Sequence, residues 1–131
     1  MISAGKLLWV DCTAAAIAGV AVLALSAWLS RLHMLPRELL LFIGAVNLAY
    51  ACYSFTLAHR AHRPILLIKI LVLANVSWVI VLLGLAVTFW NHASPFGIAH
   101  LVGEAMVVGA LAAMEWNQRY QLVAAPRVEI T

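Results

Sequence analysis

The stretch ILLIKILVLANVSWVIVLLGLAVTFW, residues 65–90, contains one charged side chain, Lys69, and no proline. A membrane-spanning helix needs about 20 predominantly apolar residues, because a helix rises about 1.5 Å per residue and the hydrocarbon layer is about 30 Å thick. This stretch is long enough and apolar enough to span. Three further stretches have the same character, at residues 7–30, 39–58 and 96–114. The sequence therefore predicts four membrane spans.

The composition of the whole chain agrees with this prediction. Of the 131 residues, 66% are hydrophobic and 10% are charged, whereas soluble domains average about 25% charged residues. A soluble fold of this length could not bury so much apolar surface, because small domains leave a large share of their surface exposed. We therefore expect an integral membrane protein with a single membrane domain over residues 1–131.

Short polar connections separate the four spans. They are RLHMLPRE at residues 31–38, HRAHRP at residues 59–64 and NHASP at residues 91–95. Connections of this length place successive helices side by side and antiparallel. Because backbone groups in lipid must be satisfied within the segment, the spans should be helices. The predicted fold is an all-α four-helix membrane bundle with antiparallel neighbouring helices, followed by a short tail at residues 115–131.

The distribution of basic residues predicts the orientation. With the N-terminus in the cytoplasm, six of the eight Lys and Arg residues fall on the inner side, and only Arg31 and Arg37 fall outside. Basic residues are enriched in cytoplasmic loops. We therefore expect both termini to be cytoplasmic, in a bacterial inner membrane.

The distribution of Lys and Arg residues also indicates which kinds of partner to expect. Basic residues scattered over the span ends do not form the basic patch of a nucleic-acid-binding protein, so no nucleic-acid partner is expected despite the net charge of +3. The expected partners are membrane lipid and either further copies of the chain or another membrane protein.

Small residues predict where the helices pack, because close approach of backbones stabilises helix contacts in lipid. In the second span, small and polar residues fall on one face of the helix. They are Gly44, Asn47, Ala51, Ser54 and Ala58. We expect this face to contact a neighbouring helix.

Polar residues inside the spans are the candidate site. A charge at the bilayer centre costs at least about 2.5–3.5 kcal/mol, so each such residue needs a partner or a function. Glu104 lies eight residues after Phe96, and Asn47 lies eight residues after Leu39. Both therefore lie roughly 12 Å below the outer boundary. The predicted outer polar cluster comprises Glu104, His100, Asn47, Tyr50, Asn75 and Trp78.

Three interpretations of Glu104 are compatible with the sequence. A neutral or hydrogen-bonded Glu104 could fix how the helices meet. Alternatively, Glu104 could line a cavity that binds a ligand or a partner helix. It could also carry protons or cations, as intramembrane carboxyl groups do in pumps and transporters.

A second pair of charges lies near the inner boundary. Asp11 and Lys69 each lie four residues inside their spans, so they fall at similar depth on two helices. They could form an ion pair, or Lys69 could extend to the headgroups while Asp11 reaches the interface alone. Glu115, at the end of the fourth span, is expected to be a solvated charge.

No sequence motif indicates catalysis or metal binding. The chain lacks a P-loop, HExxH, GxGxxG, a nucleophile elbow and a set of Cys and His with metal-ligand spacing. Four of the five histidines lie in connections, so a haem with two histidine ligands is not expected. The run HRAHR, residues 59–63, should contact anionic headgroups. We expect no catalytic residue, no metal and no cofactor.

Two functions remain. The first is a binding or accessory role for a small polytopic membrane protein that uses the outer polar cluster. The alternative is an oligomeric small transporter or channel subunit in which Glu104 is the ionisable element.

Overall fold

The computed structural model describes residues 4–60 and 62–124, and these residues form helices and turns without strands. The helices are α1 (Ala4–Ala24), α2 (Ser26–His33), α3 (Arg37–Ala58), α4 (Ile65–Thr88), α5 (Pro95–Asn117) and α6 (Arg119–Ala124). The four longest, α1, α3, α4 and α5, are long and apolar enough to cross a membrane. The prediction of an all-helical chain with four candidate spans is confirmed.

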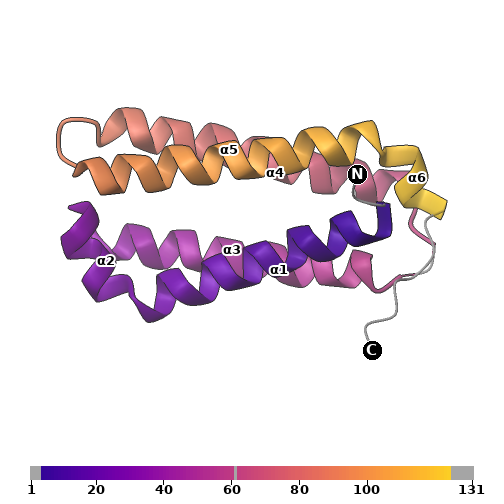
Figure 1. Ribbon diagram of the computed structural model, residues 1–131, viewed down its shortest axis with the longest axis horizontal. Helices are drawn as coiled ribbons and strands as arrows, with labels where there is room; N and C mark the ends of the chain where they lie inside the picture. The colour runs from indigo at the N-terminus through magenta and orange to yellow at the C-terminus, as the bar shows by residue number, and fades with distance from the viewer. Residues whose placement is uncertain (1–3, 61, 125–131) are drawn as a thin grey trace.

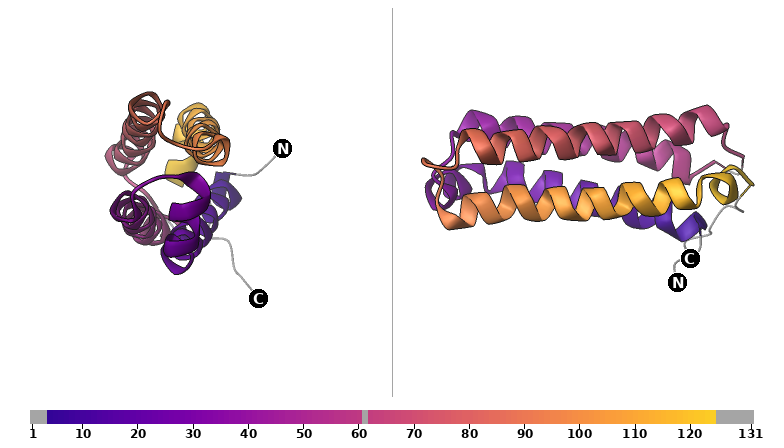
Figure 2. Two further views of the ribbon diagram at one scale, coloured as in Figure 1. Left: turned by 90° about the vertical axis from the view of Figure 1, so that its left-hand side faces the viewer. Right: turned by 90° about the horizontal axis from the view of Figure 1, so that it is seen from above.

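The long helices form two closely packed pairs. Helix α1 packs on α3, and α4 packs on α5, whereas the two pairs approach each other less closely (Figures 1 and 2). Helix α2 lies at the end of the bundle that holds the α4–α5 connection, and α6 lies at the opposite end (Figure 1). The space between the pairs is therefore where all four long helices can contribute side chains.

Glycine allows α1 and α3 to approach closely. A Cβ atom added to Gly19 would lie 3.0 Å from the carbonyl oxygen of Gly44, and one added to Gly44 would lie 2.7 Å from Leu23 Cγ. Both distances are too short for a larger residue unless the neighbouring atoms shift. All five residues of the small face predicted in α3, Gly44, Asn47, Ala51, Ser54 and Ala58, are buried, so the predicted contact face is confirmed.

The predicted first span is not one continuous straight helix. The chain kinks at Leu25, and α2 then leads toward the start of α3 (Figure 1). Polar contacts hold this bend: Arg37 Nε donates to Ser26 Oγ at 3.1 Å, and Ser30 Oγ donates to the carbonyl oxygen of Leu35 at 2.6 Å. The long apolar helix therefore ends at Ala24 instead of Ser30, because the last turns of the predicted span form local contacts with the following connection.

Two apolar clusters occupy the two ends of the bundle. The cluster near α2 includes Leu40, Ile43, Leu82 and Leu101. The cluster near α6 includes Leu8, Leu57, Ile68 and Leu122.

Arg63 departs from the expectation that the run HRAHR contacts headgroups. Its side chain is fully buried, and it donates hydrogen bonds to the carbonyl oxygens of Leu57, Ala58 and Leu122. The carbonyl groups at the end of a helix have no partner within the helix. Arg63 supplies that partner at the end of α3 and ties α6 to it.

Candidate functional site

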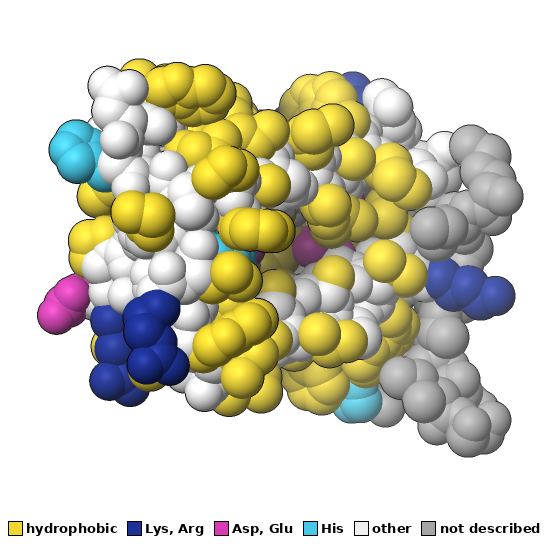
Figure 3. Space-filling view, turned by 60° about the vertical axis from the view of Figure 1, so that its left-hand side comes forward, with side chains coloured by type: hydrophobic (Ala, Val, Ile, Leu, Met, Phe, Trp, Pro, Cys, Tyr) yellow, Lys and Arg dark blue, Asp and Glu magenta, His cyan; other side chains and the backbone are white. Residues whose placement is uncertain are grey.

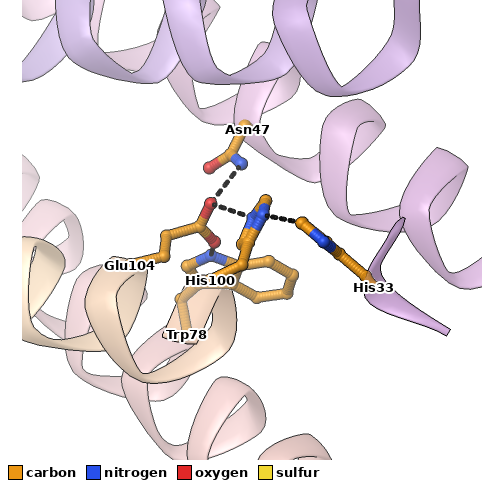
Figure 4. A network of polar contacts seen from close by, with 5 residues as sticks. All are labelled: His33, Asn47, Trp78, His100 and Glu104. Atoms are coloured by element: carbon orange, nitrogen blue, oxygen red, sulfur yellow. Dashed lines mark hydrogen bonds and ion pairs between the residues drawn. The ribbon is translucent and has the colours of Figure 1, made fainter. Parts of the chain in front are cut away.

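Glu104 is the centre of a polar network on the α2 side of the bundle, which we call the outer network (Figure 4). Asn47 Nδ2 donates to Glu104 Oε1 at 3.2 Å, and Trp78 Nε1 donates to Glu104 Oε2 at 3.0 Å. His100 Nε2 lies 3.6 Å from Oε1, one helical turn away on α5. Each carboxylate oxygen thus accepts a hydrogen bond from another helix, so Glu104 links α5 to α3 and α4.

His33 extends the outer network toward the end of the bundle. Its Nε2 atom lies 3.0 Å from His100 Nδ1 (Figure 4). Its Nδ1 atom is buried without a hydrogen-bond partner. Burial, followed by the neighbouring His100, lowers the pKa of His33 below its usual value. A neutral His33 fits this environment, since protonation would bury an unpaired N–H group.

The position of His33 depends on the contact between α2 and the start of α5. The backbone N–H of Ser94 donates to the carbonyl oxygen of His33 at 2.9 Å, and Ser94 Oγ donates to that of Leu32 at 2.6 Å. A Cβ atom on Gly97 would lie only 2.5 Å from the His33 carbonyl oxygen. Ser94 also caps α5, accepting a hydrogen bond from Gly97 N–H. The helix start that the sequence marks with Ser94 and Pro95 is therefore also the platform that holds His33.

A second polar network lies on the α6 side, and we call it the inner network. Tyr50 OH donates to Asp11 Oδ2 at 2.5 Å, and Asn75 Nδ2 donates to both Tyr50 OH and Glu115 Oε1 at 2.7 Å. These four residues come from α3, α1, α4 and α5 respectively. The other Glu115 oxygen, Oε2, is buried without a hydrogen-bond partner. This network therefore links all four long helices.

A cavity of about 440 Å³ separates the two networks. Residues of all four long helices line it, most of them apolar, with Ala14, Ala15 and Ala18 forming the α1 side. Polar side chains reach it from the outer network through Asn47, Trp78 and Glu104, and from the inner network through Asp11, Tyr50 and Asn75. Figure 3 shows a hollow in the apolar surface with acidic and histidine side chains at its bottom.

The structure divides the predicted outer polar cluster. Glu104, His100, Asn47 and Trp78 come together as predicted. Tyr50 and Asn75 belong instead to the inner network, because their side chains contact Asp11 and Glu115. The sequence assigned Tyr50 and Asn75 to the outer cluster from their depth along the helix alone. Depth does not specify the direction in which a side chain points.

The structure does not bring Asp11 and Lys69 together. Asp11 is 2% exposed and bonds to Tyr50, whereas Lys69 lies on the exposed face of α4. Lys69 and Asp11 occupy similar depths, but Lys69 faces away from the bundle. The exposed Lys69 agrees with the alternative in which its side chain extends to the headgroups. The other half of that alternative is wrong, because Asp11 does not reach the interface but is buried and accepts a hydrogen bond from Tyr50.

Two residues of the networks were misjudged from sequence. Glu115 was expected to be solvated, but it is fully buried because α5 continues to Asn117 and directs this side chain inward. The sequence places His33 in the connection at residues 31–38, but the structure places it at the end of α2, where it is only 5% exposed. The spacing of His100 and Glu104 gave no information about His33, which reaches them only through the kink at Leu25.

Among residues 4–60 and 62–124, no group of three or more His, Cys, Asp or Glu side chains is arranged to hold a metal ion. The two histidines of the outer network contact each other instead of converging on a shared position. Cys12 and Cys52 are free thiols. Comparisons of the chain with protein-family models, with curated proteins and with solved structures found no match.

Proposed function

We propose that this protein binds a small, mostly apolar molecule in the cavity between its two helix pairs, with Glu104 as the polar anchor. The cavity carries the proposal: its volume of about 440 Å³ lies within the range of about 300–1,000 Å³ typical of small-molecule sites. Such sites combine apolar walls with a few polar groups that orient the ligand. Glu104 meets that description, since its side chain lines the cavity and remains 12% exposed.

The charges around the cavity suggest the polar end of the ligand. The ionisable lining residues are Asp11, Glu104, Tyr50 and Tyr53, and no Lys, Arg or His side chain lines the cavity in the described part of the chain. Aromatic faces attract cations as well, and Trp78 lies beside Glu104. The proposed ligand therefore has an apolar body and a cationic or hydrogen-bond-donating end.

A matched pair of fluorescent probes tests this proposal. Dansylcadaverine carries an amine, and dansyl-aminohexanoic acid carries a carboxylate on a similar chain. For the purified protein in lipid nanodiscs, we expect energy transfer from Trp78 to the amine probe and little transfer to the acid probe. Glu104→Gln should weaken binding of the amine about tenfold, equivalent to about 1.4 kcal/mol.

Three variants control this experiment. Glu38→Gln removes an exposed carboxylate at the start of α3 and should leave binding unchanged. Trp78→Phe removes the one of the five tryptophans that lines the cavity, so it should reduce the transfer signal from a probe bound there. Ala18→Phe should fill part of the cavity and weaken both probes. Equal binding of the two probes, or binding unaffected by both Glu104→Gln and Ala18→Phe, would contradict the proposal.

We further propose that the four long helices cross a bacterial inner membrane, with antiparallel neighbours and both termini in the cytoplasm. Six of the eight basic residues lie on the proposed cytoplasmic side, which supports this orientation. In a variant lacking Cys12 and Cys52, a cysteine at position 94 should react with an impermeant thiol reagent added from the periplasm. Labelling from the cytoplasmic side alone would reverse the topology.

One observation supports the alternative function, an oligomeric transporter or channel subunit. Glu104, His100 and His33 form a chain of contacts that leads from the cavity toward the α2 end of the bundle. Histidine exchanges protons near neutral pH, so such a chain is suited to proton transfer. This function predicts a pH-gradient-driven proton flux in proteoliposomes that Glu104→Gln abolishes, and cross-linking of copies of the chain. Absence of flux leaves the binding function as the proposal.

A further inference from the structure

The cavity between the helix pairs opens sideways. Several residues that line it are also exposed on the outer surface of the bundle: Val107 is 55% exposed, Ile70 42% and Val81 41%. Ala49 and Ala74, which also line the cavity, are exposed as well. Hydrophobic side chains surround the hollow in the surface (Figure 3). The cavity therefore meets the surface along the long helices, on sides that would face lipid.

The two ends of the cavity are different from its sides, because packed apolar side chains lie beyond them. The lining runs over residues 11–18 of α1 and residues 46–53 of α3. Buried residues of the two apolar clusters flank these segments, namely Leu8, Val22, Ile43 and Leu57. A solute from water would have to pass these side chains to reach the cavity from an end of the bundle.

Two contacts delimit an opening between α3 and α4. Toward the outer network, the rings of Phe42 on α3 and Trp78 on α4 lie with their centroids 6.0 Å apart. Toward the inner network, Tyr53 OH on α3 donates to the carbonyl oxygen of Leu67 on α4 at 2.9 Å. These helices belong to different pairs, and the pairs approach each other less closely than the helices within a pair. The opening lies between the aromatic contact and the tyrosine hydrogen bond.

Small side chains leave this opening unfilled near the middle of the proposed membrane. Ala49 on α3 and Ala74 on α4 lie between the two contacts and line the cavity. Ala49 lies ten residues after Leu39 and Ala74 lies nine residues after Ile65, so both are roughly 15 Å inside their spans at a rise of about 1.5 Å per residue. The hydrocarbon layer is about 30 Å thick. The opening therefore faces the centre of that layer.

We propose that the ligand of this cavity is a single-chain amphiphile dissolved in the bilayer, which enters sideways between α3 and α4. This inference rests on the proposed function, because it names the class and the source of the ligand. A molecule that is already in the hydrocarbon layer reaches the opening without crossing the apolar clusters. Its cationic or hydrogen-bond-donating end contacts Glu104, and its chain lies against the apolar walls. A cavity of about 440 Å³ suits one chain better than the two chains and headgroup of a phospholipid.

Competition on the wild-type protein in lipid nanodiscs tests the class of ligand. Dansylcadaverine is bound first, and an unlabelled amine is then added. Decylamine, which dissolves in the bilayer, should displace the probe, whereas putrescine, a short diamine that stays in water, should not. Decanoate carries a carboxylate on a chain of the same length and should leave the probe bound, which controls for disturbance of the bilayer. Failure of decylamine to displace the probe, or equally effective displacement by putrescine, would overturn the proposal.

The rate of release tests the route. Ala49→Phe and Ala74→Phe narrow the opening from α3 and from α4. Each should slow the release of bound probe, measured as the loss of energy transfer after addition of excess decylamine. The expected factor is about tenfold, equivalent to a barrier about 1.4 kcal/mol higher. Ala110→Phe, at an exposed alanine of α5 outside the cavity lining, is the matched control and should release the probe at the wild-type rate.

The outcomes separate this inference from the proposed function. A phenylalanine that only occupied the cavity would weaken binding and speed release, so release that is unchanged or faster in both variants overturns the route between α3 and α4. Amine binding that Glu104→Gln weakens would still support the proposed function in that case. Absence of energy transfer to the amine probe in the wild type overturns both. The competition experiment needs no variant, so the inference remains testable if Ala49→Phe and Ala74→Phe do not fold.

Discussion

The outer and inner networks use similar residues but place them in opposite electrostatic situations. In the outer network one carboxyl group, Glu104, receives hydrogen bonds from Asn47 and Trp78 and borders the cavity. In the inner network two carboxyl groups share the donors Tyr50 and Asn75, and one oxygen has no partner. The ratio of donors to acids differs, although each network contains one asparagine as a donor.

The two networks therefore differ in the number of hydrogen-bond donors available to each buried acid. A carboxylate with a donor for each oxygen and a side exposed to a cavity is oriented to anchor a ligand. Two acids with too few donors leave a buried oxygen without a partner, which is costly. The predictions below test whether the two networks differ in this way.

The largest expected difference in the free energy of unfolding is between the alanine variants of the two asparagines, Asn75 and Asn47. Asn75 donates to Tyr50 and Glu115, whereas Asn47 donates to Glu104, which keeps its bond from Trp78. Asn75→Ala should therefore lower the free energy of unfolding by about 2–3 kcal/mol, since it leaves a buried acid unsatisfied. Asn47→Ala should cost about 0.6–1.7 kcal/mol, the range for one hydrogen bond between membrane helices. Unfolding by sodium dodecyl sulfate in mixed micelles measures both, and equal losses would contradict the comparison.

Glu104 should tolerate loss of its charge but not loss of its side chain. Glu104→Gln preserves the shape of the side chain and an oxygen that accepts from Trp78 or Asn47, so the unfolding free energy should change little. Glu104→Ala should lower it by about 1–2 kcal/mol through lost interhelical hydrogen bonds. The same unfolding measurement, made beside the dansyl-probe assay, separates a stabilising role from a binding role. Unchanged stability and binding in Glu104→Ala would exclude both.

A double-variant comparison can identify the residue that interacts with Asp11 in the inner network. Asp11→Asn and Tyr50→Phe remove the two ends of one hydrogen bond, so the double variant should be less destabilised than the sum of the single variants by about 0.5–1.5 kcal/mol. Lys69→Ala, combined with Asp11→Asn, should add no such coupling. Coupling of Asp11 to Lys69 instead of Tyr50 would restore the ion pair that the structure lacks.

The smallest expected effect is the pH dependence that His33 gives the outer network. Its pKa is lowered in the folded protein, so the unfolded chain binds more protons, and stability should fall as pH drops through the usual value near 6.5 toward the lowered folded value. His100 and, beyond it, Glu104 are the titratable groups that face His33. Thermal unfolding between about pH 8 and pH 5 should show this loss, and His33→Gln should reduce it. An identical pH profile in His33→Gln would show that His33 does not contribute.

The residues that position the sites could be predicted only in part. Ser94 and Pro95 mark the start of α5 in the sequence, and the spacing of His100 and Glu104 places them on one face of that helix. The small face of α3 was predicted as a contact face and is buried. Asn75 and Tyr50 were assigned to the outer cluster but contact Asp11 and Glu115 instead, because depth along a helix allows contact with either network.

The sequence by itself determined that the chain has four apolar helices joined by short connections, because helix length and hydropathy are local properties of consecutive residues. Only the tertiary structure decided which polar side chains share a network, where the cavity lies and which acids lack donors. These depend on the rotation of each helix about its axis and on the kink at Leu25, which places His33 against His100. Rotation is set by side-chain packing between helices distant in sequence, such as the contact of Gly19 with Gly44, and no local pattern encodes it.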